Sequence, residues 1–504
     1  MKPDKRQFLL RAGMGCFAFA ALSALINILV FPYARDYHGY SALPVYASFA
    51  AALFLFVFAG RKLRTAQDTQ LLRIRRIAVP VYLIVLFLLH ILLGYLMEYV
   101  PAGDNFMLYN GSQTLARDGD FHTYPDFGLY LARFSNQWGF LMMLTGFWKL
   151  LAMIGIESFF MPLVIVQALL YTMGVLCALR IVRRLGGVRG ELMLLVLLAL
   201  CLPMYFAAAV LYTDTFSLPF VLLALYLALR AGEAKTLKGQ LLFALACGVV
   251  TFIGGQIKMT VAIVMIAAVL CWLLTMKPLR AALCGAICVL TLTLGTTAVQ
   301  QAMLGPVIDP AVYAQQNTPV IHWIMMSIPT GNNPYGNATG DYGITWGMMD
   351  EGASHEEVMD SIYTRMKDRI YTLRYPNRLL AAMLRKNAAA MGDGTFGLSE
   401  MLDDNPVREN GVSAFVLASR PYYPAYSAVC TGVYLASLAL ALCGCARDLR
   451  RRDTSAAMLY IAAFGVMLFL LIWEARSRYF FNFVPVFLML SALSAVSTGK
   501  EETR

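Results

Sequence analysis

The 504-residue sequence predicts an all-α membrane protein that crosses the bilayer many times. Three observations support this fold class: 59% of the residues are hydrophobic, only 14% are charged, and long apolar runs recur along most of the chain. Soluble domains average roughly a quarter charged residues, so the composition excludes a soluble enzyme. The ten cysteines lie within apolar runs or at their ends, which is typical of small buried hydrophobes rather than of a disulfide framework.

Thirteen apolar runs are candidates for membrane helices, because a span needs about 20 mostly apolar residues. The first run follows a basic start and is interpreted as a retained helix, since no small-residue cleavage site follows it. The runs lie near residues 8–31, 42–60, 77–100, 138–154, 159–180, 191–212, 215–230, 240–257, 260–276, 281–304, 422–444, 455–473 and 479–497.

The distribution of basic residues decides which run does not cross. Lys and Arg concentrate in cytoplasmic loops, and thirteen crossings would place the basic loop 180–190 outside. The run 138–155 is short and contains Lys149, so we expect it to lie in or dip into the outer interface. Twelve spans then remain, and both termini are predicted to be cytoplasmic. The basic clusters that now face the cytoplasm are 2–6, 61–76, 180–189, 230–238, 277–280, 447–452 and 500–504.

The same topology explains most of the charge excess. The chain has 41 Lys and Arg against 30 Asp and Glu, a formal net charge of +11. In a soluble protein such an excess suggests anionic partners, but here it specifies which loops stay in the cytoplasm. No nucleic-acid partner is expected. The partners that follow from the composition are membrane lipids.

Four regions follow along the chain. The segment 305–421 is too long to be an unstructured connection and is predicted to be a small folded domain outside the cytoplasm. Within it, Ser354 and Glu357 form an S-x-x-E capping box, and Pro376 can begin a second helix. The regions are two spans with a basic loop (1–76), a core of spans with a first external loop at 101–155 (77–304), the loop domain (305–421) and the C-terminal spans (422–504).

Ionisable residues gather at the outer membrane face under this topology. Charges at the ends of spans are costly unless they are solvated or paired, so we expect them to be functional. Two carboxylates and several cations on one side suit the transfer of a group from a phosphate-linked carrier. The carboxylates are Asp104 after the third span and Asp214 in YTDT, and the cations are Lys258 between two closely spaced spans and Arg476 and Arg478 in WEARSRYFF. Glu474, in the same stretch as the two arginines, is a candidate for substrate contact.

The chemistry of such a transfer matches these residue types. A carboxylate can act as general base on an acceptor hydroxyl or amine, and Arg can bind phosphate oxygens at two points. A lipid phosphate lies naturally at headgroup level, whereas no G-x-G-x-x-G or Walker-type loop for a soluble nucleotide is present. His322 and Trp323 in IHWIMMS are weaker candidates for substrate contact. Asp104 and Asp214 lack further oxygen ligands, so no metal ligand is assigned and a divalent cation stays open as the only cofactor.

The order of these features resembles the GT-C superfamily of integral-membrane glycosyltransferases. The likeness is to bacterial members similar to protein O-mannosyltransferases and lipid A aminoarabinose transferases, in glycosyltransferase family 39, and it runs from about Ile77 to Val496. The resemblance implies a polyprenyl-phosphate-linked sugar donor at the outer leaflet, an extracytoplasmic acceptor and inversion at the sugar carbon. Its parts are GDNFMLYNGSQTLARDGD after a span, SNQWG before a surface helix, RIVRRLGG, YTDT, a large external loop and EARSRY.

The resemblance also implies residue roles. Asp104 corresponds to the catalytic acid or base of the first loop, and Asp214 to a second aspartate near the reaction centre. The carrier phosphate would be bound by Lys258, Arg476 and Arg478, with the surface helix covering the lipid groove.

Three departures from the family separate this chain from its better-known members. SNQWG stands where members often carry a Pro-Pro-Leu-like stretch, two extra spans precede the core, and Asn105 follows Asp104 where a second acid is usual. The identities of the donor and acceptor therefore do not carry over. Two alternatives also stay open. One is a ligase that moves a whole lipid-linked glycan, and the other is a non-enzymatic transporter or flippase of a lipid-linked sugar, which predicts ionisable residues near the bilayer midplane and internal repeats.

Overall fold

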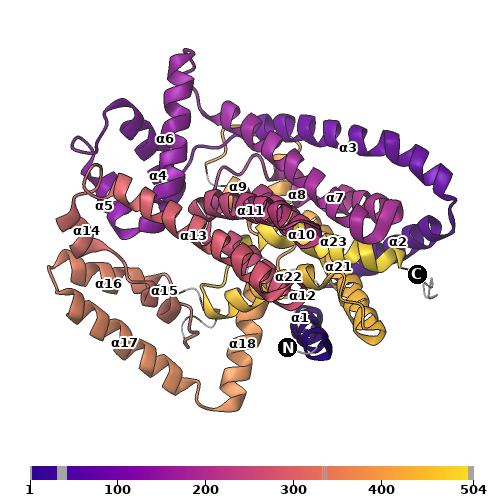
Figure 1. The fold of residues 1–504 in the computed structure, drawn as a ribbon. Coiled ribbons are helices and arrows are strands. Elements are labelled where there is room, and N and C mark those ends of the chain that lie inside the picture. The colour runs from indigo at the N-terminus through magenta and orange to yellow at the C-terminus, as the bar shows by residue number, and fades with distance from the viewer. Residues whose placement is uncertain are drawn as a thin grey trace.

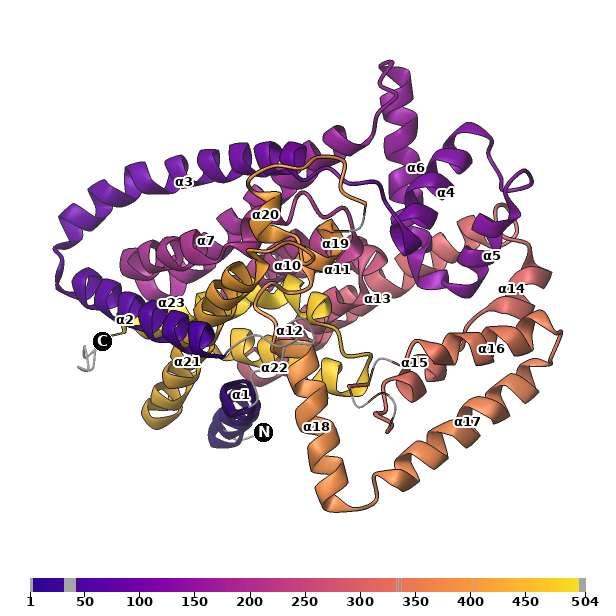
Figure 2. The same cartoon turned by 180° about the vertical axis from the view of Figure 1, so that it is seen from behind.

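The computed structural model describes residues 3–30, 42–331, 333, 335–336, 338–403 and 405–497, and every regular element within them is a helix (Figures 1 and 2). In these ranges nine helices are long and apolar enough to cross a membrane, and two more apolar helices are shorter. The prediction of an all-α polytopic membrane protein is therefore confirmed.

The long apolar segments follow the predicted runs closely. The nine are α1 (Pro3–Val30), α2 (Leu43–Thr65), α3 (Asp68–Leu96), α7 (Phe160–Leu200), α9 (Thr213–Phe216) with α10 (Leu218–Glu233), α11 (Leu237–Ile257), α13 (Pro278–Met303), α21 (Tyr423–Arg451), and η3 (Ser477–Phe483) with α23 (Val484–Val496). The two shorter ones are η2 (Met259–Val261) with α12 (Ala262–Thr275), and α22 (Ala457–Ile472).

The longest helix, α7, is a hairpin that contains two predicted runs. Gly187 interrupts it with a φ of 65° and a ψ of −161°, a backbone conformation that glycine adopts at little cost. A Cβ placed on Gly190 would lie 3.4 Å from the carbonyl oxygen of Val182, whereas residues eight apart in a straight helix are about 12 Å apart. The chain therefore reverses at Gly187.

The second half of this hairpin is shorter than the predicted run 191–212. It ends at Leu200, and the chain then continues through Cys201 and the short helix α8 (Pro203–Phe206) to α9. Cys201 leaves helical geometry, with a φ of −81° and a ψ of 79°. Pro203 has no backbone N–H with which to continue the helical hydrogen bonds, and it begins α8 instead. The prediction of a continuous span to residue 212 is wrong, because residues 201–217 form the two short helices α8 and α9 (Thr213–Phe216) joined by non-helical backbone.

Basic segments that were predicted to share one side contact each other at one end of the bundle. Arg75 and Arg183 both pair with Glu191, at 2.5 and 3.0 Å, and Arg189 pairs with Asp68 at 2.8 Å. Similar contacts are Arg184 and Arg230 with Glu233, Arg64 with the Ser497 carbonyl and Arg447 with the Ser494 carbonyl. The predicted cluster 500–504 lies outside the described residues. That this end faces the cytoplasm stays a prediction.

The helix predicted at the interface, α6 (Trp138–Met153), has 16 residues and runs across the direction of α3 (Figures 1 and 2). It packs on α4 (Gly103–Arg117), next to α5 (Pro125–Arg133) and η1 (Ser135–Gln137). These helices make up the segment predicted as the first external loop. Its orientation fits a helix that lies along the membrane rather than through it.

The described residues of the segment 305–421 contain seven helices, which range from 4 to 18 residues. The capping box is confirmed, because the Ser354 amide donates to Glu357 Oε2 at 2.8 Å and the Glu357 amide donates to Ser354 Oγ at 3.3 Å. The helices are α14 (Pro310–Gln316), α15 (Val320–Met326), α16 (Gly340–Asp350), α17 (His355–Thr372), α18 (Pro376–Met391), α19 (Leu398–Leu402) and α20 (Ser413–Val416).

The first part of this segment has a small core of its own. Met325, Met349, Val358 and Ile362 form a small cluster separate from the main core. The later helix α18 begins at Pro376 as predicted but packs on α1, where Asn27 Nδ2 donates to the Leu384 carbonyl at 2.7 Å. Residues after about 376 are therefore part of the membrane bundle's packing.

Candidate functional site

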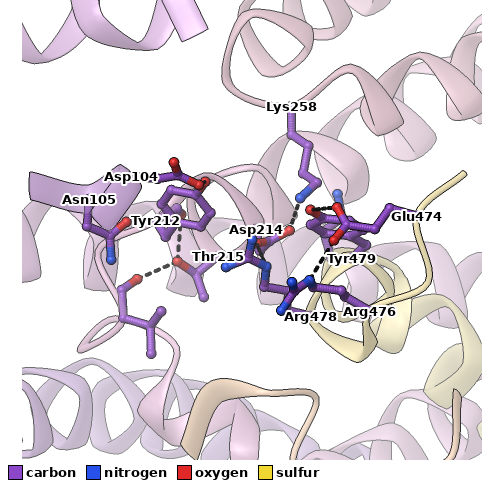
Figure 3. Close-up of polar contacts among 12 residues, drawn as sticks. Asp104, Asn105, Tyr212, Asp214, Thr215, Lys258, Glu474, Arg476, Arg478 and Tyr479 are labelled. Carbon is purple, nitrogen blue, oxygen red and sulfur yellow. Dashed lines mark hydrogen bonds and ion pairs between the residues drawn. The ribbon is translucent and has the colours of Figure 1, made fainter. Parts of the chain in front are cut away.

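Three interruptions between helices bring the predicted ionisable residues together (Figure 3). Asp214 lies in the single turn of α9, which begins directly after the extended Tyr212. Lys258 is an extended residue between α11 and η2, and Arg476 is an extended residue before η3. Backbone outside helices is tolerated at membrane depth where it is buried in protein. Helix breaks, rather than helix faces, therefore place these side chains.

The three interruptions lie far from the basic end of the bundle. The 21 residues of α11 connect the basic loop 230–238 to Lys258, which corresponds to about 31 Å of helix. Likewise α22 connects the loop after Arg451 to Glu474. The predicted site residues and most of the basic clusters thus occupy opposite ends of the helices.

Asp214 is the buried centre of this group. Its side chain is 0% exposed and pairs with Lys258 and, at 3.7 Å, with Nε of Arg478. Lys258 Nζ also lies 3.9 Å from the centroid of the Tyr479 ring, within the range of a cation–π contact. A buried carboxylate is tolerated only when it is paired, so Asp214 and its two cations form one unit.

Glu474 forms a second, adjacent ion pair. Its Oε1 accepts from Nε of Arg476 at 2.7 Å, and its Oε2 accepts from the Tyr479 hydroxyl at 2.8 Å. Burial alone would raise the pKa of Glu474, but the charges of Arg476 and Arg478 and the two hydrogen bonds more than offset it and hold the pKa below its usual value. Glu474 is therefore ionised at neutral pH.

Asp104 extends the group from the opposite side. Its carboxylate is half-buried and accepts hydrogen bonds from the Tyr130 hydroxyl at 3.2 Å and the Tyr212 hydroxyl at 3.0 Å. The Tyr212 ring in turn lies 5.1 Å from Cζ of Arg478. We call the connected set the polar cluster: Asp104, Asp214, Lys258, Glu474, Arg476 and Arg478 with Tyr130, Tyr212 and Tyr479.

The cluster is balanced in charge. It contains three carboxylates and three cations, and each cation has a carboxylate partner. Asp214 and Glu474 are nearly fully buried, whereas the side chains of Arg476 and Arg478 are 26% and 23% exposed. Both arginine contacts are made through Nε, so neither is the two-point arrangement through terminal nitrogens. The carboxylates thus lie beneath cations that reach the surface.

His322 and Trp323 are placed differently from the cluster. His322 is fully buried, its Nδ1 lies 3.0 Å from Thr345 Oγ1, and burial lowers its pKa to about 4. Trp323 is half-buried and stacks on Trp473, the residue before Glu474, with ring centroids 6.3 Å apart. The structure therefore brings Trp323 next to the cluster and leaves His322 inside the small core.

Tyr342 connects the loop segment to the cluster, and the sequence alone did not indicate it. Its ring contacts Trp323 at 5.5 Å. Burial raises the pKa of Tyr342, and the nearby carboxylates of Glu474 and Asp104 raise it further. Tyr342 therefore lies near both Glu474 and Asp104. Its neighbour in sequence, Asp341, belongs to a separate ion pair with Arg365 and Arg369.

Two further residues that the sequence did not indicate hold the helix breaks in place. The buried Asn482 amide donates to Ser217 Oγ at 3.0 Å and to Thr260 Oγ1 at 2.9 Å, which links the three interruptions. Asp393 Oδ2 accepts from the Gly397 amide at 2.7 Å and from Ser477 Oγ at 3.2 Å. Neither Asn482 nor Asp393 belongs to a recognisable sequence motif, so only the fold reveals their roles.

Lys386 is a buried cation beside the cluster. It is 4% exposed, and its Nζ donates to the Ser327 carbonyl at 2.8 Å. Burial lowers its pKa to about 7, although the charge of Glu474 partly opposes this shift. A buried lysine with a lowered pKa destabilises the folded state at pH values at which it must carry a proton.

We therefore expect Lys386→Met to change how stability depends on pH. Since the folded pKa lies below the unfolded one, the cost of Lys386 is complete below pH 7 and disappears as the pH rises towards about 10.4. The thermal midpoint of Lys386→Met should exceed that of the parent most at pH 6 and least at pH 10. Lys367→Met, at an exposed lysine of α17, is the control. Parallel pH profiles for parent and Lys386→Met would contradict the assignment.

The described residues contain no group of three or more His, Cys, Asp or Glu side chains arranged as metal ligands. The carboxylates of the polar cluster point to cations and tyrosine hydroxyls instead. The structure therefore adds no ligand set for the divalent cation that the sequence left open.

Comparisons with known proteins identify the membrane class but no reaction. The model of a family described as "Conserved hypothetical integral membrane protein" matches residues 35–498. No curated protein matches significantly. A solved structure of ArnT from Cupriavidus metallidurans bound to undecaprenyl phosphate is similar over 82% of this chain and 77% of its own, with 13% identity and a TM-score of 0.32. At that TM-score the likeness does not transfer the ligand of ArnT to this chain.

Proposed function

Because this chain belongs to a family of conserved hypothetical integral membrane proteins, whose description names no reaction, we propose its function from the polar cluster: transfer of a sugar from a polyprenyl-phosphate-linked donor to an acceptor outside the cytoplasm. The observation that carries the proposal is the contrast between the carboxylates. Asp104 is half-buried and held by tyrosine hydroxyls, whereas Asp214 and Glu474 are buried and paired with cations. One acid is thus available for proton transfer beside cations suited to phosphate.

Asp104 is the general base in this proposal. The acceptor's hydroxyl oxygen attacks the anomeric carbon of the sugar, and its proton passes to the Asp104 carboxylate. The bond between the anomeric carbon and the phosphate oxygen breaks, and the polyprenyl phosphate leaves with the electron pair. A single displacement of this kind inverts the configuration at the sugar carbon. Tyr130 and Tyr212 orient the carboxylate through their hydrogen bonds.

Arg476, Arg478 and Lys258 bind the phosphate in this proposal. Since both arginines contact their carboxylates through Nε, their terminal nitrogens suit two-point binding of phosphate oxygens. Positive charge at that position stabilises the phosphate as the leaving-group charge develops. A lipid phosphate would reach the cluster at headgroup level, since the cluster lies where helices are interrupted at one end of the bundle.

Asp214 and Glu474 hold these cations in place rather than transferring protons. Asp214 is 0% exposed and Glu474 is 3% exposed, so an acceptor would not reach either carboxylate without displacing a cation. Their charges offset the cost of burying Lys258, Arg476 and Arg478. The cluster therefore divides its acids between proton transfer and cation binding.

The proposed topology places the basic end of the bundle and both termini in the cytoplasm. Arginines that link 61–76, 180–191 and 230–233 belong to one end, and such an excess of cations favours the cytoplasmic side. The polar cluster at the other end would then face the outer leaflet. A cysteine placed at Asp126, which is exposed in the first loop segment, should react with an impermeant maleimide in intact cells.

The deciding experiment measures label transfer by the purified full chain in liposomes. The donor is a radiolabelled polyprenyl-phosphate sugar, and the acceptor is a crude envelope fraction. We expect the label to leave the lipid and to appear on an envelope molecule, with free polyprenyl phosphate as the second product. Arg478→Gln should raise the KM for the donor by roughly tenfold or more, because a hydrogen bond to a charged group contributes about 1.5–3 kcal/mol.

The two alternatives predict different products in the same assay. A flippase would move the label between leaflets without changing the molecule that carries it. A ligase would leave the single-sugar donor intact and accept a complete lipid-linked glycan. Either result, with no sugar transfer by the parent, would overturn the proposed function.

A further inference from the structure

A hollow at the basic end of the bundle lies between three membrane helices. Its volume is about 340 Å³, and it is lined by α2, α3 and the second half of the α7 hairpin. Ala59, Ala78, Leu195 and Val196 form apolar walls, and Lys62 is the one charged residue in the lining. The polar cluster lies at the other end of the helices, so this hollow belongs to a different part of the molecule.

Small side chains create the hollow. Ala59 on α2 and Ala78 on α3 are half-buried in the described structure, and opposite them α7 presents Leu195 and Val196. A hollow with such apolar walls is unfavourable for water, which needs polar partners. An apolar chain from the surrounding bilayer fills it at no such cost.

Lys62 lines one end of the hollow, and positive charge is in excess around it. The nearby carboxylates Asp68 and Glu191 are each already paired, with Arg189 and with Arg75 and Arg183. Lys62 is exposed, and its Nζ lies 5.5 Å from the centroid of the Phe58 ring. Arg61, Arg73 and Arg76 are also exposed on the same stretches of α2 and α3.

We propose that this hollow binds an anionic phospholipid. One acyl chain lies along the apolar walls formed by Ala59, Ala78 and Val196, and the phosphate lies next to the Lys62 ammonium. The apolar walls match the acyl chains of a phospholipid, and Lys62 matches its phosphate. A soluble anion would interact with Lys62 but would leave the apolar walls uncovered. A zwitterionic lipid would interact less favourably than an anionic one with the positive charge around Lys62. The site is independent of the proposed sugar transfer and of which side of the membrane this end faces.

The test compares lipids with the same acyl chains on the purified full chain in detergent. Dioleoyl phosphatidylglycerol, at about tenfold its Kd, should raise the thermal midpoint by roughly 2 °C. Dioleoyl phosphatidylcholine and glycerol phosphate should not do so. Native mass spectrometry should show one phosphatidylglycerol retained in preference to phosphatidylcholine.

Two variants separate the contributions of the headgroup and the chain. Lys62→Gln should weaken phosphatidylglycerol binding roughly fivefold, since a cation near the surface contributes about 1 kcal/mol to anionic lipid binding. Ala78→Leu fills the hollow and should abolish retention of the lipid. Lys367→Gln on α17 and Ala51→Leu on the exposed face of α2 are the matched controls.

The proposal is overturned if phosphatidylcholine binds as well as phosphatidylglycerol, or if Ala78→Leu leaves lipid retention unchanged. Stabilisation by glycerol phosphate alone would mean an anion site without a chain and would also overturn it. Should Ala78→Leu fold poorly without lipid, Lys62→Gln still decides the result through the ratio of the two lipids bound.

Discussion

Asp104→Asn is expected to reduce sugar transfer by about 10²–10⁴-fold, the contribution typical of a positioned general base. The amide cannot take the acceptor's proton at neutral pH. Its oxygen can still accept one of the tyrosine hydrogen bonds that Asp104 makes at 3.0 and 3.2 Å, so the fold should be retained. The KM for the donor should change little, because the phosphate-binding residues are untouched. Initial rates of label transfer in liposomes measure the effect.

The control for this variant is Asp126→Asn. Asp126 is an exposed acid in the first turn of α5, within the same segment, and its replacement should leave the rate unchanged. A transfer rate of Asp104→Asn within threefold of the parent would exclude Asp104 as the base. Equal loss in both variants would instead point to a general effect on this segment.

Asp214→Asn is expected to destabilise the protein by about 3–5 kcal/mol, the cost of leaving buried charges without their partner. Asp214 is 0% exposed and pairs with both Lys258 and Arg478. Removing its charge leaves Lys258 and Arg478, whose side chains are only 14% and 23% exposed, without their direct carboxylate partner. The thermal midpoint of the purified protein in detergent measures the effect, and it should fall by many degrees.

A second substitution distinguishes this explanation from a simple loss of packing. Lys258→Met in the Asp214→Asn background removes one unpaired cation, so the double variant should be more stable than Asp214→Asn alone. Additive losses in the double-mutant cycle would show that the two side chains are not coupled. Thr213→Val, an isosteric change at a buried residue of the same turn, controls for disruption of the backbone there.

The helices followed from the sequence because each is determined by local composition. Runs of about 20 apolar residues identify membrane helices whatever surrounds them, and the S-x-x-E pattern at Ser354 is a signal contained within four residues. The wrong prediction at residues 201–212 also came from local composition alone. These residues are apolar enough to span, but the helix ends at Leu200 and Pro203 begins a new short helix. Side chains from other segments, Gln167 and Tyr109, donate to the Ala207 and Leu211 carbonyls of the interrupted stretch.

The candidate site followed from the sequence only in part. Asp104, Asp214, Lys258, Glu474, Arg476 and Arg478 were found because a charge at the end of an apolar run is conspicuous. Their tyrosine partners are not conspicuous in a chain with 26 tyrosines. Tyr212 stands two residues before Asp214, which is the one local signal that would have drawn attention to it.

The sequence by itself determined that this is a polytopic helical membrane protein and which segments end in charge, since hydropathy and charge are properties of single residues and their close neighbours. Only the tertiary structure decided how those charges are distributed. It buried Asp214 and Glu474 beneath their cations, left Asp104 to two tyrosines and placed Lys386 beside them. The physical reason is that pairing and burial join different segments of the chain, such as Asp104 with Tyr212 and Asp214 with Arg478. The approach of these segments is set by helix packing and not by local composition.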